Sequence, residues 1–201
     1  MSKAPLTIGV VAGEASGDLL GAHLIRALRA HLPQVRFTGI GGPRMQSAGL
    51  DALYPMEKLA VRGYVEVLRH YLEIAGIRRK LAEHFLAEPP ALFVGVDAPD
   101  FNLGLELKLR SAGIPTAHFV SPSIWAWRGG RMRGIRQAVS RMLTVFPFEH
   151  ALYEQAGIPV TYVGHPLAEM LSQVPGRASA REQLRLPAGG NAFISVRDGD
   201  K

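Results

Sequence analysis

Residues 6–13 read Leu-Thr-Ile-Gly-Val-Val-Ala-Gly, a largely apolar run of strand length. A stretch of helical character begins at Ser16, shortly after this run, and continues to His31, where Pro33 stops it. A buried strand that passes at once into a helix is typical of a parallel sheet covered by helices. We therefore expect an α/β fold.

The same alternation continues along the chain and predicts six strands. It places them at residues 6–13, 35–40, 91–96, 116–120, 142–146 and 160–164. Helices are expected over about 16–31, from Pro43 onward, over 59–88 and over 103–112. Residues 174–190 are rich in proline and glycine, which indicates a linker or a helix and turn leading out of the domain.

The composition excludes several classes of protein. The 201 residues are 47% hydrophobic and 20% charged, which is typical of a globular chain with a sizeable core. The absence of cysteine excludes a disulfide framework, thiolate catalysis and cysteine-based zinc sites. The first apolar run is too short to span a bilayer, and Glu14 and Asp18 follow it at once, so we expect a cytoplasmic protein. The net charge of +6 suits nucleic acid, an anionic membrane or a phosphorylated substrate.

Polar or Gly/Pro-rich loops follow the expected strands. In an open α/β sheet, ligands bind beyond the carboxyl ends of the strands. These loops therefore indicate a binding site, although any α/β protein needs turn residues there. They span residues 13–18, 41–44, 97–102, 121–128, 146–149 and 164–166.

The first of these loops lacks both the glycine pattern of dinucleotide-binding sites and the lysine of a P-loop. Its Glu14 and Asp18 carboxylates would repel a phosphate at the start of the following helix. Carboxylates and the Ser16 hydroxyl suit sugar hydroxyl groups better. Capping of the helix by Ser16, with Asp18 complementing the helix dipole, is the alternative.

Asp97 stands directly after the apolar run 92–96. A carboxylate at that edge of the sheet is placed to act as a general base. An Asx turn entering the next helix is the alternative, and it explains Asp100 and Asn102 better than it explains Asp97.

Two tryptophans and four arginines lie between Trp125 and Arg136. Such a mixture could stack bases, bind a sugar phosphate or rest on a membrane surface. No RNA- or DNA-binding motif accompanies it, so we do not expect nucleic-acid binding.

The seven histidines show no metal-ligand spacing, and among them His165 follows a strand closely enough to touch a ligand. No metal is expected, although the proximity of Asp97 and Asp100 keeps that question open.

Residues 65–77 have an unusually wide apolar side for a helix. The apolar residues spread over about half of the circumference, whereas a core-facing stripe needs only about 100°. The basic run Arg78-Arg79-Lys80 follows directly. This pattern fits a helix that dips into an anionic membrane interface, and equally a helix buried on two sides or a partner interface.

Seven motifs in this order resemble those of the lipid-A-disaccharide synthases, a family of bacterial glycosyltransferases. They cover nearly everything up to about residue 170 and match the N-terminal half of the family. The motifs are VAGEASGD (11–18), GGPRMQSAG (41–49), LAVRGYVEVL (59–68), VGVDAPDFN (94–102), HFVSPSIWAWR (118–128), FPFE (146–149) and VGHP (163–166).

The resemblance implies a GT-B architecture, in which two Rossmann-like domains face each other, with residues 1–174 as the acceptor-binding domain. It implies an inverting transfer of diacylated glucosamine from UDP to diacylglucosamine 1-phosphate at the inner-membrane surface, with no cofactor. Another GT-B enzyme such as a UDP-sugar epimerase, or a non-catalytic fragment that binds a membrane surface, is the alternative. Whether the chain forms a homo-oligomer stays open.

The resemblance also assigns roles to particular residues. Asp97 matches the family's base, and Glu14 and Ser16 match polar residues of its active site. Four further residues are expected to shape the acceptor side: Asp100, Asn102, Ser121 and Trp127. The family's exposed hydrophobic patch, which associates with the inner membrane, matches Val65, Val67, Leu68, Tyr71, Ile74 and Ala75.

The chain departs from the family pattern at its end. The family is about twice as long, and its second domain holds the UDP-binding residues. Here the hydrophobic stretch 193–196 leads into Arg197-Asp198-Gly199-Asp200-Lys201 instead of an LPGSR-type loop. We therefore expect residues 175–201 to be a linker and the truncated start of the nucleotide-sugar-binding domain. With most of that domain missing, the chain alone should be weakly active or inactive.

Overall fold

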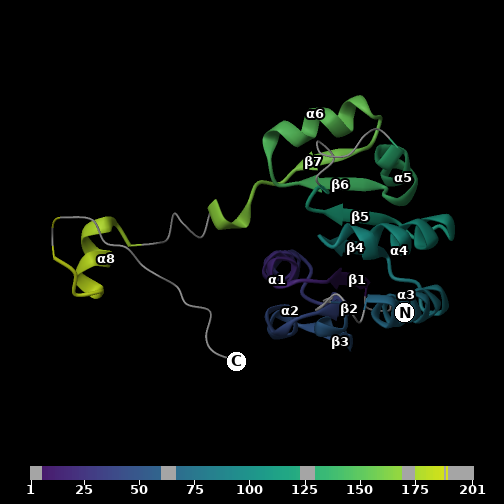
Figure 1. The fold of residues 1–201 in the computed structure, drawn as a ribbon, viewed down its shortest axis with the longest axis horizontal. Helices are drawn as coiled ribbons and strands as arrows, with labels where there is room; N and C mark the ends of the chain where they lie inside the picture. Colours follow the sequence, from purple (N-terminus) through teal and green to yellow (C-terminus); the bar gives the residue numbers. More distant parts are fainter. Residues whose placement is uncertain (1–5, 60–66, 123–129, 169–174, 188, 190–201) are drawn as a thin grey trace. The chain divides into compact units, whose positions relative to one another are not determined.

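The computed structural model describes residues 6–59, 67–122, 130–168, 175–187 and 189 (Figure 1). Seven parallel strands form one sheet in the order β3-β2-β1-β4-β5-β6-β7. The strands are β1 Thr7–Ala12, β2 Arg36–Gly41, β3 Leu50–Pro55, β4 Leu92–Val96, β5 Thr116–Phe119, β6 Arg141–Thr144 and β7 Val160–Tyr162. The helices are α1 Ala15–His31, α2 Pro43–Ala48, the 3₁₀ helix η1 Met56–Lys58, α3 Val67–Ala87, α4 Pro99–Ser111, α5 Gly130–Ala138, α6 Pro147–Gln155 and α8 Arg177–Gln183.

The chain divides into two compact units. The first, Met1–His165, contains the whole sheet and the helices from α1 to α6. The second, Pro166–Lys201, contains α8.

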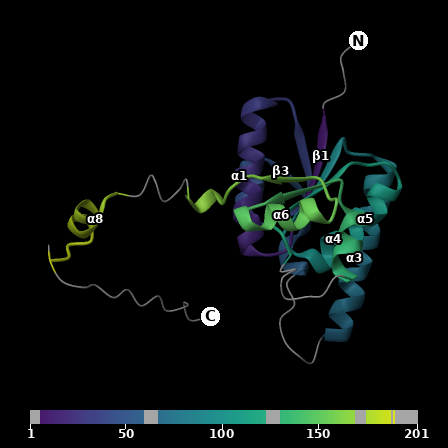
Figure 2. The ribbon, with the colours of Figure 1, turned by 90° about the horizontal axis from the view of Figure 1, so that it is seen from above.

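Helices cover both faces of the sheet, and Figure 2 shows α1 on one side and α3 and α4 on the other. Side chains alternate between the two faces along each strand. Val10 packs with Ile25 of α1 in one core cluster, whereas its neighbour Val11 packs with Phe85 of α3 in another. A strand buried on both faces needs a continuous apolar run, which is why residues 6–13 form one. The expected Rossmann-like α/β fold is confirmed.

The order of the strands reverses between β1 and β4. From β1 the chain moves outward through β2 to β3, and it then places β4 on the other side of β1. Ala12 lies beside Val96 in the resulting strand pair. The loops that follow these two strands therefore leave the sheet side by side, at the kind of switch point where Rossmann-like folds bind ligands.

The structure differs from the sequence-based expectation at several elements, including helices α5 and α6, which were not among the expected helices. Strand β3 was not expected: Asp51 lies within it, Pro55 ends it, and its residues are mostly half-buried or exposed, so its sequence forms no continuous apolar run. Of the expected helix 59–88, α3 covers Val67–Ala87, residue 59 is a turn after η1, and residues 60–66 lie outside the described residues. Helix α4 begins at Pro99 and not at residue 103, because proline suits the first helical position. Asp100 and Asn102 are therefore helical.

The buried carboxylate of Asp18 caps α2 and not its own helix. Its Oδ1 accepts a hydrogen bond from the Met45 N–H at 3.0 Å, and its Oδ2 accepts one from the Arg44 N–H at 3.1 Å. These N–H groups lie in the first turn of α2, where the helix offers them no partner. Gly42 leaves room for this contact, since a Cβ there would lie 2.7 Å from Asp18 Cγ. Asp18 thus joins α1 to α2.

We expect Asp18→Ala to lower the free energy of unfolding by about 1–3 kcal/mol, because two backbone N–H groups lose their acceptor. Urea unfolding of the 201-residue chain measures this change. Glu14→Ala is the control, since the exposed Glu14 side chain makes no capping hydrogen bond. Equal stabilities of the two variants would contradict the capping role.

Candidate active site at the strand switch point

The loops after β1 and β4 touch each other at the switch point. A Cβ at Gly13, the residue after β1, would lie 2.9 Å from the Cβ of Ala98. The two loops can approach this closely because Gly13 has no side chain. Their polar residues are thereby brought to one place, as the sequence predicts.

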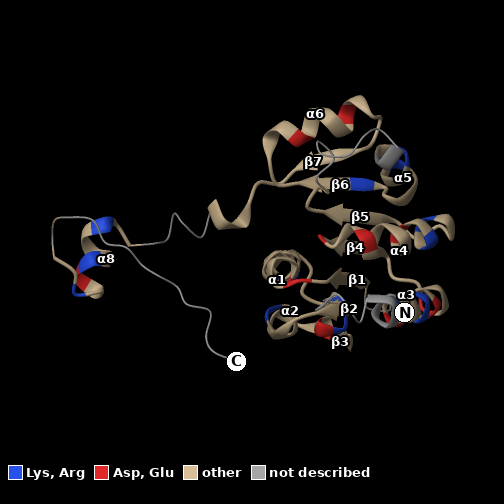
Figure 3. Ribbon diagram, viewed as in Figure 1, with Lys and Arg blue, Asp and Glu red and all other residues tan. Residues whose placement is uncertain are grey.

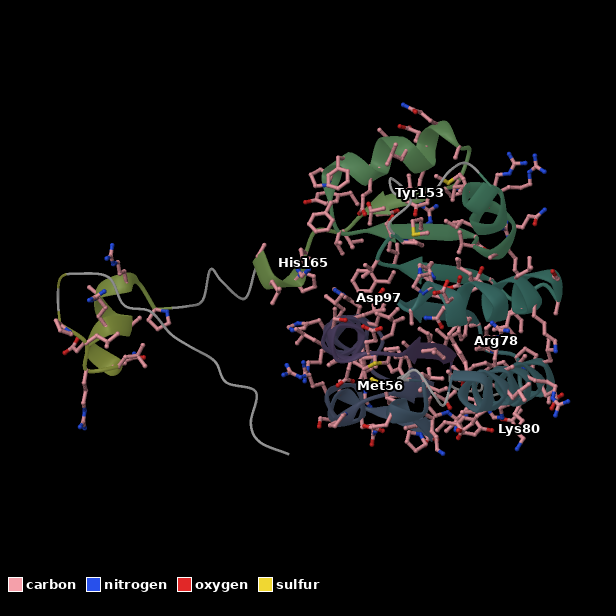
Figure 4. All side chains as sticks on the ribbon, viewed as in Figure 1. Met56, Arg78, Lys80, Asp97, Tyr153 and His165 are labelled. Carbon is pink, nitrogen blue, oxygen red and sulfur yellow. The ribbon has the colours of Figure 1, made fainter. Side chains whose placement is uncertain are left out.

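Asp97 and Ala98 form a left-handed turn between β4 and α4. Their φ angles are 53° and 44°, a conformation that costs a non-glycine residue about 1–2 kcal/mol. Such residues persist only where the surrounding structure holds them, and they concentrate at functional sites. The turn leaves the Asp97 side chain half-buried at the carboxyl edge of the sheet (Figure 4).

The side chain of Asn102 holds this turn in place. Its Nδ2 donates hydrogen bonds to the carbonyl of Asp97 at 2.8 Å and to the carbonyl of Val11 at 3.2 Å. Asn102 is fully buried. The residue that was expected to shape the acceptor side therefore contacts the turn itself, and its amide ties that turn to β1.

The first turn of α1 brings a hydroxyl to Asp97. Ser16 Oγ donates to Asp97 Oδ2 across 3.5 Å, a long hydrogen bond. Ser16 and Glu14 are both exposed, as is Asp100 in the first turn of α4. Asp97, Ser16 and Glu14 thus offer two carboxylates and a hydroxyl on neighbouring loops, which suits the hydroxyl groups of a sugar.

A buried polar pair lies beside the turn, between the sheet and α4. His118 Nδ1 and Glu106 Oε1 are 2.7 Å apart, and both side chains are fully buried. His118 pairs with Gly95 in the sheet, and a Cβ at Gly95 would collide with Glu106 and Asn102. The sequence analysis did not find this pair, because a glutamate and a histidine twelve residues apart form no local motif.

Ser121 follows β5 and contacts a buried tyrosine. Its Oγ lies 2.8 Å from the hydroxyl of Tyr153 in α6, and it donates to the carbonyl of Pro122 at 3.0 Å. Burial raises the pKa of Tyr153 to about 12. Ser121 itself is half-buried at the same edge of the sheet as Asp97.

Aromatic rings lie at the ends of β6 and β7. Phe146 and Phe148 stack with their centroids 5.7 Å apart, and the His165 ring lies 6.1 Å from that of Phe146. The two phenylalanines are 47% and 60% exposed. His165, which the sequence singles out among the histidines, therefore belongs to an apolar cluster at the carboxyl edge.

The expected hydrophobic patch lies on α3 and is described in part. Ile74 packs against the core, Ala75 is half-buried, and Leu72 is 67% exposed. The structure describes the backbone but not the side chains of Val67, Leu68 and Tyr71. Val65 and, on the acceptor side, Trp127 lie outside the described residues.

Neither a metal cluster nor a membrane span is found in the described ranges. No three histidine, aspartate or glutamate side chains there are grouped so that they could hold a metal ion. No helix in that part of the chain combines the length and the apolar character needed to cross a bilayer.

The sequence matches a known family over nearly its whole length. The family model described as lipid-A-disaccharide synthetase matches residues 8–199. The lipid-A-disaccharide synthase of Aromatoleum aromaticum is 63% identical over 180 residues, which are 90% of this chain and 46% of that protein. The Paraburkholderia xenovorans synthase is 57% identical over 100% of this chain and 52% of its own length. The chain thus spans about half the length of the curated relatives it matches.

Solved structures of nucleotide-sugar enzymes share the fold at low identity. The UDP-GlcNAc 2-epimerase of Neisseria meningitidis has a TM-score of 0.54 and 12% identity, over 90% of this chain and 52% of that one. The UGT2 of Phytolacca americana has a TM-score of 0.51 and 12% identity, over 87% and 58% of the two chains. This likeness confirms the fold of half a GT-B enzyme, and the family model identifies the sequence: the chain belongs to the lipid-A-disaccharide synthase family.

Proposed function

We propose that this chain forms the acceptor-binding half of a glycosyltransferase of lipid A biosynthesis. The reaction transfers 2,3-diacylglucosamine from UDP to 2,3-diacylglucosamine 1-phosphate and yields the β-1,6-linked disaccharide 1-phosphate and UDP. Family membership supports this reaction. The single observation that carries it is the half-buried Asp97 carboxylate, held in a left-handed turn where β1 and β4 diverge.

Asp97 acts as the general base in this scheme. Its carboxylate takes the proton from the acceptor's 6-hydroxyl as that oxygen bonds to the anomeric carbon of the donor sugar. The bond between that carbon and UDP breaks, and attack from the opposite face inverts the configuration. Ser16 Oγ, 3.5 Å from Asp97 Oδ2, orients the carboxylate. Glu14, exposed on the same loop, accepts hydrogen bonds from sugar hydroxyl groups.

Two alternative functions, a UDP-sugar epimerase and a non-catalytic membrane-binding fragment, would require different features of the chain. A UDP-sugar epimerase needs no acceptor, and the N. meningitidis epimerase shares only the fold with this chain at 12% identity. A non-catalytic membrane-binding fragment has no use for a strained turn at Asp97 and Ala98. Family membership and that strain both favour the transferase.

We further infer that the protein acts in the cytoplasm, at the surface of the inner membrane. Leu72 on α3 is 67% exposed, and the basic run 78–80 follows on the same helix, where Figure 3 shows lysine and arginine in blue. An exposed apolar side chain next to cations suits an anionic membrane interface. Substrates that carry acyl chains require contact with such a surface.

We expect Asp97→Asn to reduce turnover about 10²–10⁴-fold, because the base is lost while the shape of the side chain stays. UDP release measures this in a chimera that joins this chain to the second half of the A. aromaticum synthase, with both acylated substrates in micelles. Asp51→Asn, which changes an exposed aspartate on the edge strand β3, is the control. Near-normal turnover by Asp97→Asn would remove Asp97 from this role, and an inactive parent chimera would contradict the proposed function.

Asn102→Ala should lower kcat about 10–100-fold and leave KM nearly unchanged, because a released turn misplaces Asp97 without touching the substrate. The same chimera and assay measure both constants. Ser111→Ala, at the far end of α4, is the control and should have no effect. A raised KM with a normal kcat would show that Asn102 binds the acceptor instead.

The paired change Val67→Ser and Leu68→Ser should weaken binding to lipid vesicles about tenfold or more, because each apolar side chain contributes about 1.5–3 kcal/mol on burial. Co-sedimentation of the 201-residue chain measures this binding. Leu32→Ser with Leu107→Ser, which changes two exposed leucines elsewhere, is the matched control. Unchanged binding by the Val67 and Leu68 variant would exclude the patch.

A further inference from the structure

A groove lies at the edge of the sheet, between the end of β3 and the middle of α3. Its volume is about 370 Å³. Because β3 is the outermost strand, two others separate it from β4, and the groove is distinct from the site at Asp97. Its walls include Tyr54, Pro55 and Lys58 on one side and Glu73, Gly76 and Lys80 of α3 on the other.

Gly76 leaves the groove open. Glu73, Gly76 and Lys80 are spaced three and four residues apart, so they share one face of the helix. A Cβ at Gly76 would meet no atom within 4 Å, so close packing does not require a glycine there. Glycine inside a helix costs about 1 kcal/mol relative to alanine. A residue that lowers the stability of its helix, with no packing contact that requires it, is typical of a functional position.

The groove combines apolar walls with positive charge. Tyr54 and Ile77 contribute apolar surface. Lys58 Nζ lies 2.7 Å from Glu73 Oε1, so the charge of Glu73 is matched within the groove. Lys80 adds a second ammonium group, which makes no ion pair with any side chain that the structure describes. The net charge of the groove is therefore positive, and it favours an anion.

An exposed leucine lies one turn of α3 away from the part of the groove at Gly76. Leu72 precedes Gly76 by four residues, so it shares that face of α3, and it is 67% exposed. Lys80 follows Gly76 by four residues, which puts Leu72 and Lys80 about 12 Å apart along the helix axis. A ligand that spans both positions carries an anion at one end and an apolar group at the other.

We propose that this groove binds the headgroup of an anionic phospholipid. The phosphodiester lies at Lys80, whose charge is not matched by Glu73, and the acyl chains begin beside Leu72. A phosphate ester without acyl chains would match the cations but leave Leu72 uncovered. The site does not depend on the reaction proposed at Asp97, and it adds headgroup recognition to the apolar insertion proposed for α3.

Co-sedimentation of the 201-residue chain with phosphatidylcholine vesicles, with and without phosphatidylglycerol, tests the proposal. Gly76→Leu fills the groove and raises the helix propensity of α3, so unfolding would not explain a loss of binding. Gly76→Ala adds a single methyl group and is its control. Lys80→Gln removes the cation, and Lys108→Gln, on the exposed side of α4, matches it in charge.

Lys80→Gln should weaken binding to phosphatidylglycerol vesicles about fivefold, the loss expected for one cation near an anionic surface. Gly76→Leu should weaken it by a similar factor, because the filled groove keeps the phosphate away from Lys80. Both controls should bind these vesicles like the parent chain. Binding to pure phosphatidylcholine should be the same for all the variants. The Val67 and Leu68 variant, by contrast, should lose binding to both kinds of vesicle, so the apolar patch and the groove are tested separately.

Unchanged binding by Gly76→Leu would overturn the proposal. An equal loss in Lys80→Gln and Lys108→Gln would also overturn it, because overall charge would then drive the adsorption. Glycerol 3-phosphate separates lipid from a free phosphate ester. If glycerol 3-phosphate shifts the amide NMR signals of Gly76 and Lys80, while Gly76→Leu and Lys80→Gln leave vesicle binding unchanged, the groove binds a free phosphate ester. The proposal of a phospholipid would then be wrong.

Discussion

The side-chain amide of Asn102 holds together the ends of the two central strands. It donates to the carbonyl of Asp97 after β4 and to the carbonyl of Val11 in β1, so one buried group anchors both sides of the switch point. The left-handed turn at Asp97 and Ala98 is unfavourable by itself. The anchor offsets that cost, and the position of the candidate base depends on it.

Buried polar groups next to the anchor stiffen this part of the domain. The Glu106–His118 pair is fully buried, and removing either partner would leave the other without its hydrogen bond in an apolar environment. Gly95 provides the space in which the pair and Asn102 pack together. Polar bonds therefore specify the backbone near the site, whereas the two main clusters on either face of the sheet are held by apolar packing.

The sequence predicts the strands that form uninterrupted runs of apolar or β-branched residues. Strand 92–96 is such a run, and the edge strand β7 was expected as well, whereas Asp51 lies within β3 and Pro55 ends it. Asp97 could be singled out because parallel strands bring their carboxyl ends to one edge. The role of Asn102 could not be predicted, because it depends on how α4 packs against β1 and the local pattern indicates only an Asx turn. The groove at Gly76 likewise depends on the contact between β3 and α3.

The hydroxyl group of Ser121 at the end of β5 lies within hydrogen-bond distance of two neighbours, the carbonyl of Pro122 and the hydroxyl of Tyr153. Because the pKa of Tyr153 is raised to about 12, the phenol keeps its proton at neutral pH. When Ser121 donates its one proton to Pro122, the phenol donates to Ser121, and Ser121 Oγ can then only accept a further hydrogen bond. In that arrangement, a ligand that reaches Ser121 must bring its own proton, as a sugar hydroxyl or an amide N–H does.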